Sequence, residues 1–149
     1  NNIRTLGVAL SPCILPEAGK PTFEIDDDEI EIGMGIHGEP GIKREKLKSA
    51  NDLVDDLYQR ILNDSKLKSN DKIAIMINSL GATPLEELYI VSKKFNENLN
   101  NSNIINIKSY VGRYATSMEM SGMSITIFKL DENLEKYLFA ESVCPFWTN

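Results

Sequence analysis

The chain has 149 residues, 42% of them hydrophobic, which is the size and apolar content of one ordinary domain with a buried core. Its formal net charge of −6 argues against binding to nucleic acid or to an anionic membrane, because either would require a basic face. No apolar run approaches the roughly 20 residues of a membrane-spanning helix. Small molecules and proteins are therefore the expected partners.

The start of the chain and its cysteines indicate how the chain is produced and in which compartment it functions. The chain does not begin with methionine, and a strand-like segment starts within a few residues of Asn1, so we expect a fragment or a processed chain. Nothing at the start has the form of a signal peptide, which favours an intracellular protein with Cys13 and Cys144 as free thiols. One histidine and two distant cysteines do not form a metal-ligand cluster, so we predict no metal site.

The first quarter of the chain alternates short strands with loops. Thr5–Leu10 is typical of a buried strand, and residues 11–21 are predicted to form a loop because they contain three prolines. Thr22–Ile25 fits a short strand. Residues 26–29 are all acidic and are interpreted as a solvated turn rather than as a cation site, because no EF-hand spacing follows.

The next strand, predicted over residues 29–37, ends on the only histidine of the chain. Successive side chains of a strand point to opposite faces. One predicted face is apolar and consists of Ile30, Ile32, Met34 and Ile36. The other consists of Glu29, Glu31, Gly33, Gly35 and His37. A glycine within a strand can admit a ligand or another backbone, so this second face predicts a site beside the imidazole.

Two other interpretations of this segment remain open at the level of pattern. A lone histidine also fits a surface or hydrogen-bonded structural residue, and Gly33 and Gly35 also fit a β-bulge. The Gly-Glu-Pro-Gly sequence after His37 ends the strand in either case.

The middle of the chain contains two predicted helices that flank a strand. Residues 40–48 form a basic, irregular connection, after which Ser49 caps a helix. The apolar face of this helix consists of Leu53, Val54, Leu57, Tyr58, Ile61 and Leu62. A strand over residues 72–78 leads through a glycine loop to a second helix, for which Thr83 is the predicted N-cap, Pro84 the first residue and Glu86 the partner in a capping box. The loop could bind an anion, although it also fits an ordinary strand-to-helix turn and has no Walker pattern.

The last third contains strands over residues 103–111 and 123–130, a turn or short helix between them, and a final helix over residues 131–139. Three methionines are interpreted as core filler: Met118, Met120 and Met123. Strands and helices follow one another in mixed order, and some strands have one polar face. The sequence thus predicts a single α/β domain over residues 1–149, folded as a two-layer sandwich with a mixed sheet of about six strands.

Four segments together resemble the dihydroxyacetone kinase family, specifically the second half of its substrate-binding K subunit. They read GVALSPCILPEAGKPTFE, IEIGMGIHGEPG, NSLGATPLEELYIV and YVGRYATSMEMSGMSITIFKLD. The resemblance extends from Thr5 to about Pro145, and the IHGEPG and GKPTFE segments are specific in combination. It implies the second domain of the K fold, with the first half of the subunit absent from this chain.

The resemblance also implies a role for the histidine. In this family the histidine of the IHGEPG motif, here His37, adds to the carbonyl carbon of dihydroxyacetone and holds the ketone as a hemiaminal. Glycerol has no carbonyl group, so covalent capture separates the ketone from the polyol. Gly33 and Gly35 would then leave room for the substrate beside the imidazole.

Phosphorylation of the bound ketone is implied to depend on other parts of the system. The donor is ATP or an ADP-bound phosphorylated partner, supplied by an L-type kinase subunit or domain, and this chain itself binds no cofactor. The general acid and base lie in the preceding half of the K subunit. The family resemblance further implies a homodimer, a cytoplasmic location and a role in glycerone and glycerol metabolism, in some members with the phosphotransferase system.

Departures from the family pattern keep a second function open. Residues 78–84 read NSLGATP where the family usually has NGLGGTP, and the ending ESVCPFWTN is also unusual. Some K-like paralogues keep the histidine and act as ketone-binding co-activators of transcription. We favour the kinase subunit and keep the co-activator as the alternative.

Overall fold

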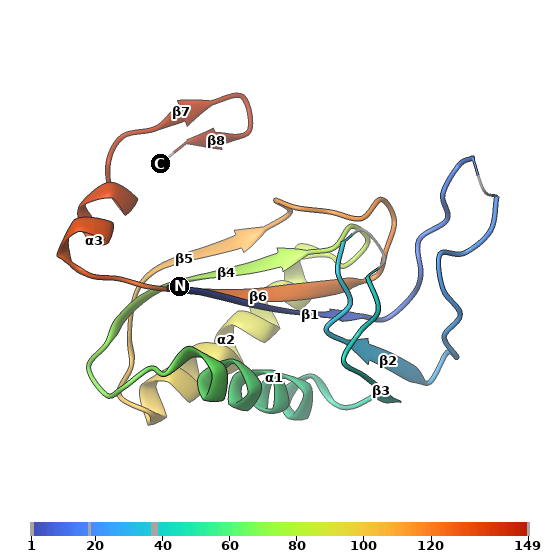
Figure 1. Ribbon diagram of the computed structural model, residues 1–149, viewed down its shortest axis with the longest axis horizontal. Helices are drawn as coiled ribbons and strands as arrows, with labels where there is room; N and C mark the ends of the chain where they lie inside the picture. The colour runs from blue at the N-terminus through green and yellow to red at the C-terminus, as the bar shows by residue number, and fades with distance from the viewer. Residues whose placement is uncertain (1, 18, 37–38, 149) are drawn as a thin grey trace.

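The computed structural model describes residues 2–17, 19–36 and 39–148, in which two helices cover one face of a six-stranded mixed sheet (Figure 1). The strands are β1 (Ile3–Ala9), β2 (Glu29–Ile32), β3 (Lys43–Lys46), β4 (Lys72–Ser79), β5 (Ile105–Gly112) and β6 (Gly122–Lys129). Their order is β3-β2-β1-β6-β4-β5, with β4 and β5 parallel and the other neighbours antiparallel. The predicted two-layer α/β sandwich is confirmed.

Helix α1 (Ala50–Ser65) begins as the sequence predicts. The hydroxyl of Ser49 accepts a hydrogen bond from the Asp52 amide at 3.2 Å and so caps the first turn. Its buried face packs on the sheet and on α2 (Leu85–Asn101), where the Tyr58 and Phe95 rings meet edge to face at 5.4 Å.

Helix α2 begins differently from the prediction. Pro84 is its N-cap residue, and no side chain caps the first turn. The Thr83 hydroxyl instead accepts a hydrogen bond from the Gly122 amide at 2.8 Å, so it ties the β4–α2 loop to the start of β6. The predicted capping box is therefore wrong, because a tertiary donor uses the hydroxyl that the local pattern assigned to the helix.

The core lies between the sheet and the two helices. Alternate residues of the central strands point into it and are almost fully buried: Val8, Ile73, Ile75, Ile77, Ile125 and Ile127. Each such side chain contributes about 1.5–3 kcal/mol of transfer free energy relative to exposure. Met120 and Met123 are buried as predicted, whereas Met118 is 42% exposed.

The β2–β3 region departs from the predicted long strand. β2 ends at Ile32 because Gly33 has a positive φ of 85°, which turns the chain out of the sheet. Met34 packs in a second apolar cluster with Cys13 and Leu80, and Ile36 is 37% exposed, so the four apolar side chains do not share one face. The basic connection contains a strand, β3, that pairs with β2 along its whole length.

Two smaller predictions concern segments near the N-terminus. No strand forms at Thr22–Ile25; the nearest pairing among the described residues is the isolated bridge between Ile14 and Pro21. Cys13 is buried, Cys144 is exposed, and both are free thiols as predicted.

The C-terminal segment lies on the side of the sheet opposite α1 and α2 (Figure 1). It consists of α3 (Glu132–Leu138) and a hairpin of β7 (Val143–Cys144) and β8 (Trp147–Thr148). The Trp147 ring contacts the rings of Tyr110 and Tyr114, with centroids 4.7 and 5.6 Å apart. Across the described residues, every helix is too short or too polar to cross a membrane.

Candidate functional site

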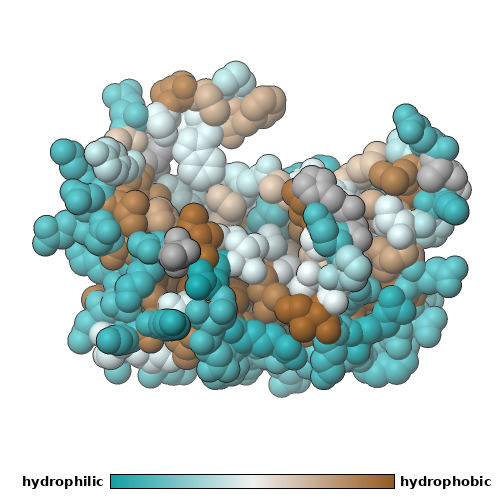
Figure 2. Space-filling view, viewed as in Figure 1, coloured by the Kyte–Doolittle hydropathy of each residue, from teal (hydrophilic) through white to brown (hydrophobic). Residues whose placement is uncertain are grey.

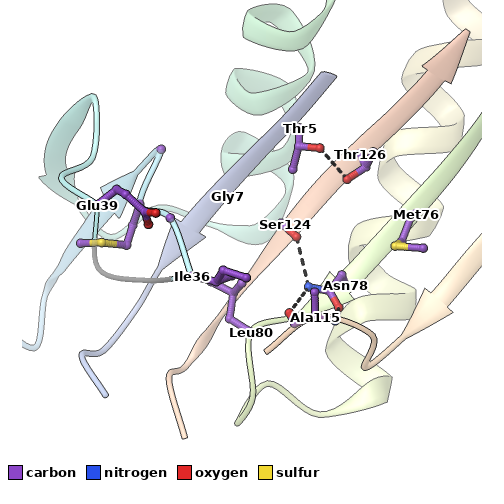
Figure 3. Close-up of a pocket in the computed structure, with 13 residues that line it drawn as sticks. Thr5, Gly7, Ile36, Glu39, Met76, Asn78, Leu80, Ala115, Ser124 and Thr126 are labelled. Atoms are coloured by element: carbon purple, nitrogen blue, oxygen red, sulfur yellow. Dashed lines mark hydrogen bonds between the residues drawn. The ribbon is translucent and has the colours of Figure 1, made fainter. Parts of the chain in front are cut away.

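The face of the sheet that α1 and α2 leave uncovered forms the floor of an open cavity of about 540 Å³. Figure 2 shows the molecule hollowed on this side, between the C-terminal segment and the loops at the opposite end. Most of the floor consists of small or polar residues of three adjacent strands, namely Thr5, Gly7, Asn78, Ser124 and Thr126, and Met76 completes it (Figure 3). These residues alternate with the buried apolar side chains, so the same strands supply both core and cavity.

Hydroxyl groups on the floor are brought together by strand register. Thr5 and Thr126 are partners in the β1–β6 ladder, and their hydroxyl oxygens lie 2.9 Å apart. Ser124 is two residues from Thr126 on the same face and is paired with Gly7, which has no side chain to cover it. The floor therefore presents hydroxyl donors and acceptors that a small polyhydroxylated ligand can use.

Asn78, at the end of β4, joins the floor to the loop after β5. Asn78 is only 3% exposed. Its Nδ2 donates to the Ala115 carbonyl at 2.7 Å and to the Ser124 hydroxyl at 3.2 Å. Oδ1 accepts from the amides of Tyr114 and Ala115 at 2.8 and 2.9 Å. Burial raises the pKa of the Tyr114 phenol. Asn78 thus fixes the rim of the cavity on this side.

The opposite wall is formed by residues 33–36 and 39, which belong to the loop of residues 33–42 between β2 and β3. The Gly33 amide donates to the Gly7 carbonyl and the Ile42 amide to the Ile32 carbonyl, both at 2.7 Å. Nearer the tip, the Gly35 amide donates to the Glu39 carbonyl at 3.3 Å. The predicted site residue His37, with Gly38, lies outside the described residues. Its nearest described neighbours, Ile36 and Glu39, both line the cavity.

The two predicted site glycines, Gly33 and Gly35, also line the cavity, and each accommodates a neighbour from its own loop. A Cβ on Gly33 would lie 2.6 Å from Cγ1 of Ile42, and one on Gly35 would lie 2.1 Å from Oε2 of Glu39. The space that these glycines leave is therefore adjacent to Ile42 and to the Glu39 carboxylate. Their role beside a ligand remains a prediction.

The three carboxylates near the loop differ in their surroundings. Glu29 pairs with Lys46 at 3.7 Å, and Glu31 is buried against Arg44 at 3.1 Å. Glu39 alone among these three lines the cavity. It is the carboxylate best placed to face a bound molecule, a position that strand alternation did not reveal because the strand ends before it.

The glycine loop after β4 uses its amides within the protein. The Gly81 amide donates to the Ser79 hydroxyl at 3.2 Å, and the Ala82 amide donates to the Met120 carbonyl at 3.0 Å. A phosphate cradle requires such amides to point at the ligand, so this loop fits the strand-to-helix turn. No group of three or more His, Cys, Asp or Glu side chains that could hold a metal ion occurs in the described part of the chain.

Comparison with known proteins identifies the family. The family described as the Dak1 domain matches residues 1–146. The chain belongs to the dihydroxyacetone kinase family. Over 131 residues it is 50% identical to a PTS-dependent dihydroxyacetone kinase 1, dihydroxyacetone-binding subunit DhaK, of Listeria innocua, covering 88% of this chain and 40% of the relative. The corresponding subunit of Lactococcus lactis is 42% identical over 132 residues, covering 89% of this chain and 40% of the relative.

A solved structure extends the comparison to a regulator. The chain superposes on the dihydroxyacetone kinase operon co-activator Dha-DhaQ with a TM-score of 0.87 and 32% identity, covering 94% of this chain and 44% of that one. The chain spans less than half the length of each of these three proteins. The chain is therefore similar in sequence to kinase subunits and in both sequence and fold to a co-activator.

Proposed function

We propose that this chain is the C-terminal, dihydroxyacetone-binding half of a K-type dihydroxyacetone kinase subunit, in which His37 captures the ketone as a hemiaminal. The observation that carries the proposal is that the nearest described neighbours of His37 on both sides, Ile36 and Glu39, line the cavity above the hydroxyl floor. The names of the related binding subunits support the choice of ligand.

The proposed capture needs only the imidazole and the ketone. The unprotonated ring nitrogen of His37 attacks the carbonyl carbon, a C–N bond forms, and the carbonyl π electrons move to oxygen. The proton of the other ring nitrogen is lost as the oxygen gains one, so the adduct has the full mass of both reactants. The unperturbed pKa of about 6.5 for imidazole leaves a free-base fraction at neutral pH. The hydroxyls of Ser124 and Thr126 are available to bind those of the ketone.

Phosphoryl transfer is assigned to groups outside this chain. We propose that an L-type subunit or domain supplies the phosphoryl group, from ATP or from an ADP-bound phosphorylated form, and that residues 1–149 bind no nucleotide or metal. The phrase PTS-dependent in the names of related subunits supports the second donor. The general acid and base would come from the preceding half of the subunit, which would act as a cytoplasmic homodimer.

The test is His37→Ala in the full-length subunit. Wild-type protein incubated with dihydroxyacetone should show an intact-mass increase of ~90 Da, the mass of the ketone added without loss of water. The variant should lose this increase and keep its circular-dichroism spectrum. Glycerol, which has no carbonyl group, is the matched chemical control and should give no adduct with either protein. An adduct retained by His37→Ala would refute the assignment.

A second candidate function is a ligand-responsive co-activator of transcription. The TM-score of 0.87 to a co-activator supports this second function. The two functions would share ketone capture and differ in phosphoryl transfer. Turnover with a competent partner separates them.

A further inference from the structure

Glu31 is a buried carboxylate at the base of the loop of residues 33–42. It lies in β2, one residue before the strand ends, and is 9% exposed. Oε1 accepts a hydrogen bond from the Gly41 amide at 2.8 Å, and Oε2 accepts one from the Arg44 guanidinium at 3.1 Å. Both carboxylate oxygens are therefore used, one on the loop and the other on the facing strand.

Gly41 is shaped to receive this carboxylate. A Cβ on Gly41 would lie 2.6 Å from Cγ of Glu31 and 2.7 Å from the Ile32 carbonyl oxygen. Contacts that short do not occur for real side chains, so glycine is what allows the loop backbone to approach Glu31. Arg44 is the ladder partner of Glu31 in the β2–β3 pair, which explains why the guanidinium reaches the carboxylate.

Main-chain bonds hold both ends of the loop, and a side chain adds to them at one end. The N-terminal end is held by the bond from the Gly33 amide to the Gly7 carbonyl, and the C-terminal end by the bond from the Ile42 amide to the Ile32 carbonyl. One residue nearer to the tip, the Gly41 amide also donates to the Glu31 carboxylate. His37 lies between these two anchors in the sequence.

We propose that Glu31 is a positioning residue for His37. It holds the loop backbone at Gly41, four residues after His37 in the sequence, and so limits the positions that the imidazole can take relative to the ketone. This inference rests on the proposed capture by His37. A charge-assisted hydrogen bond in a partly buried place holds backbone more firmly than a neutral one, and misplacement of a reacting group by about 1 Å can cost about 100-fold in rate.

The experiment measures the rate of the ~90 Da adduct in the full-length subunit, well below the melting temperature of every variant. Glu31→Ala should slow capture by about 10- to 100-fold. Glu31→Gln keeps an oxygen for the Gly41 amide but loses the charge, so it should recover part of this loss. Glu29→Gln is the matched control, because Glu29 lies on the same strand and pairs with Lys46 away from the loop, and it should react as wild type. A variant that is only less stable has fewer folded molecules, but these capture the ketone at the wild-type rate. An order of capture rates in which Glu29→Gln equals wild type, Glu31→Gln is slower and Glu31→Ala is slowest therefore separates positioning from stability.

Capture by Glu31→Ala at the wild-type rate would overturn the inference, as would an equal loss in Glu31→Gln and Glu31→Ala. If Glu31→Ala does not fold, Gly41→Ala disturbs the same contact from the loop side, and a wild-type rate there would also overturn it. Failure of the proposed function has a separate signature. In that case the wild-type protein forms no adduct, or His37→Ala still forms it.

Discussion

Asn78 and Ser124 are ladder partners in the β4–β6 pair, and Nδ2 of Asn78 donates a hydrogen bond to the Ser124 hydroxyl at 3.2 Å. The same amide also binds the backbone of Tyr114 and Ala115. One buried side chain thus connects a floor residue of the cavity to its rim, and the shape of the cavity depends on it.

Replacing this amide should destabilise the protein. Asn78→Ala leaves two backbone amides and one carbonyl without their partner, and a buried unsatisfied group costs about 1–3 kcal/mol. We expect the free energy of unfolding in urea to fall by about 2–4 kcal/mol. Asn106→Ala is the control: Asn106 binds Asn96 and Ser109 at the partly exposed edge strand, and its loss should cost under about 1 kcal/mol. Equal losses would mean that Asn78 is not the organising contact.

A side chain at Gly35 should block ligand binding without unfolding the domain. Gly35 lies outside the strands, and a Val there must displace the Glu39 carboxylate and fill space beside Ile36. Calorimetric titration of Gly35→Val with dihydroxyacetone should show affinity reduced at least about tenfold, with the circular-dichroism spectrum retained. Ala140→Val, at an exposed position outside the cavity lining, should bind as wild type. Undiminished binding to Gly35→Val would mean that the ligand approaches from elsewhere.

The sequence predicted the core elements because their periodicity is strong. The alternation of Ile125 and Ile127 with Ser124 and Thr126 identified a strand with a polar face, and the structure makes that face the cavity floor. β3 was missed because KREK has no apolar alternation. Its place in the sheet comes from pairing with β2 and from ion pairs such as Arg44 with Glu31, which only the fold brings together.

The assembly of the site could not be predicted from local pattern. Thr5, Asn78 and Thr126 are far apart in the sequence and become neighbours only through the order β1-β6-β4. The strand predicted to end at His37 was too long because alternation continues through Gly33, whose positive φ of 85° ends the strand. The alternation of apolar residues does not show that Gly33 has a positive φ. The position of Glu39 in the loop beside the cavity could therefore not be predicted from the alternation.

Acid should weaken the protein through Asp71. The Lys129 ammonium, 2.5 Å from its carboxylate, is the main cause that lowers the Asp71 pKa below 3.8, and the Lys68 amide adds to it. A carboxyl group whose pKa is lower in the folded than in the unfolded protein stabilises the folded state at pH values above its unfolded pKa. This stabilisation is lost as the pH falls through the folded pKa. Asp71→Asn should therefore lower stability at pH 7 by up to about 1 kcal/mol and flatten the loss of stability below pH 3.8.

Urea unfolding from pH 7 down to about pH 2 measures this effect. Lys129→Met removes the main cause from the other side of the pair and should flatten the acid limb in the same way. A wild-type pH profile in both variants would show that the pair does not contribute to acid sensitivity.

Turnover separates the kinase subunit from the co-activator. If the general acid and base lie in the preceding half of the subunit, the 149-residue chain with an L-type partner and phosphoryl donor should form no detectable dihydroxyacetone phosphate, because such groups contribute about 10²–10⁴ in rate. Joining the first half should restore phosphorylated product in a kinase subunit, whereas a co-activator would form the His37 adduct and still give none. Product formed by the isolated chain would place the acid-base chemistry within it. Glu39 would then be the first residue to replace, since it lines the cavity and Glu29 and Glu31 do not.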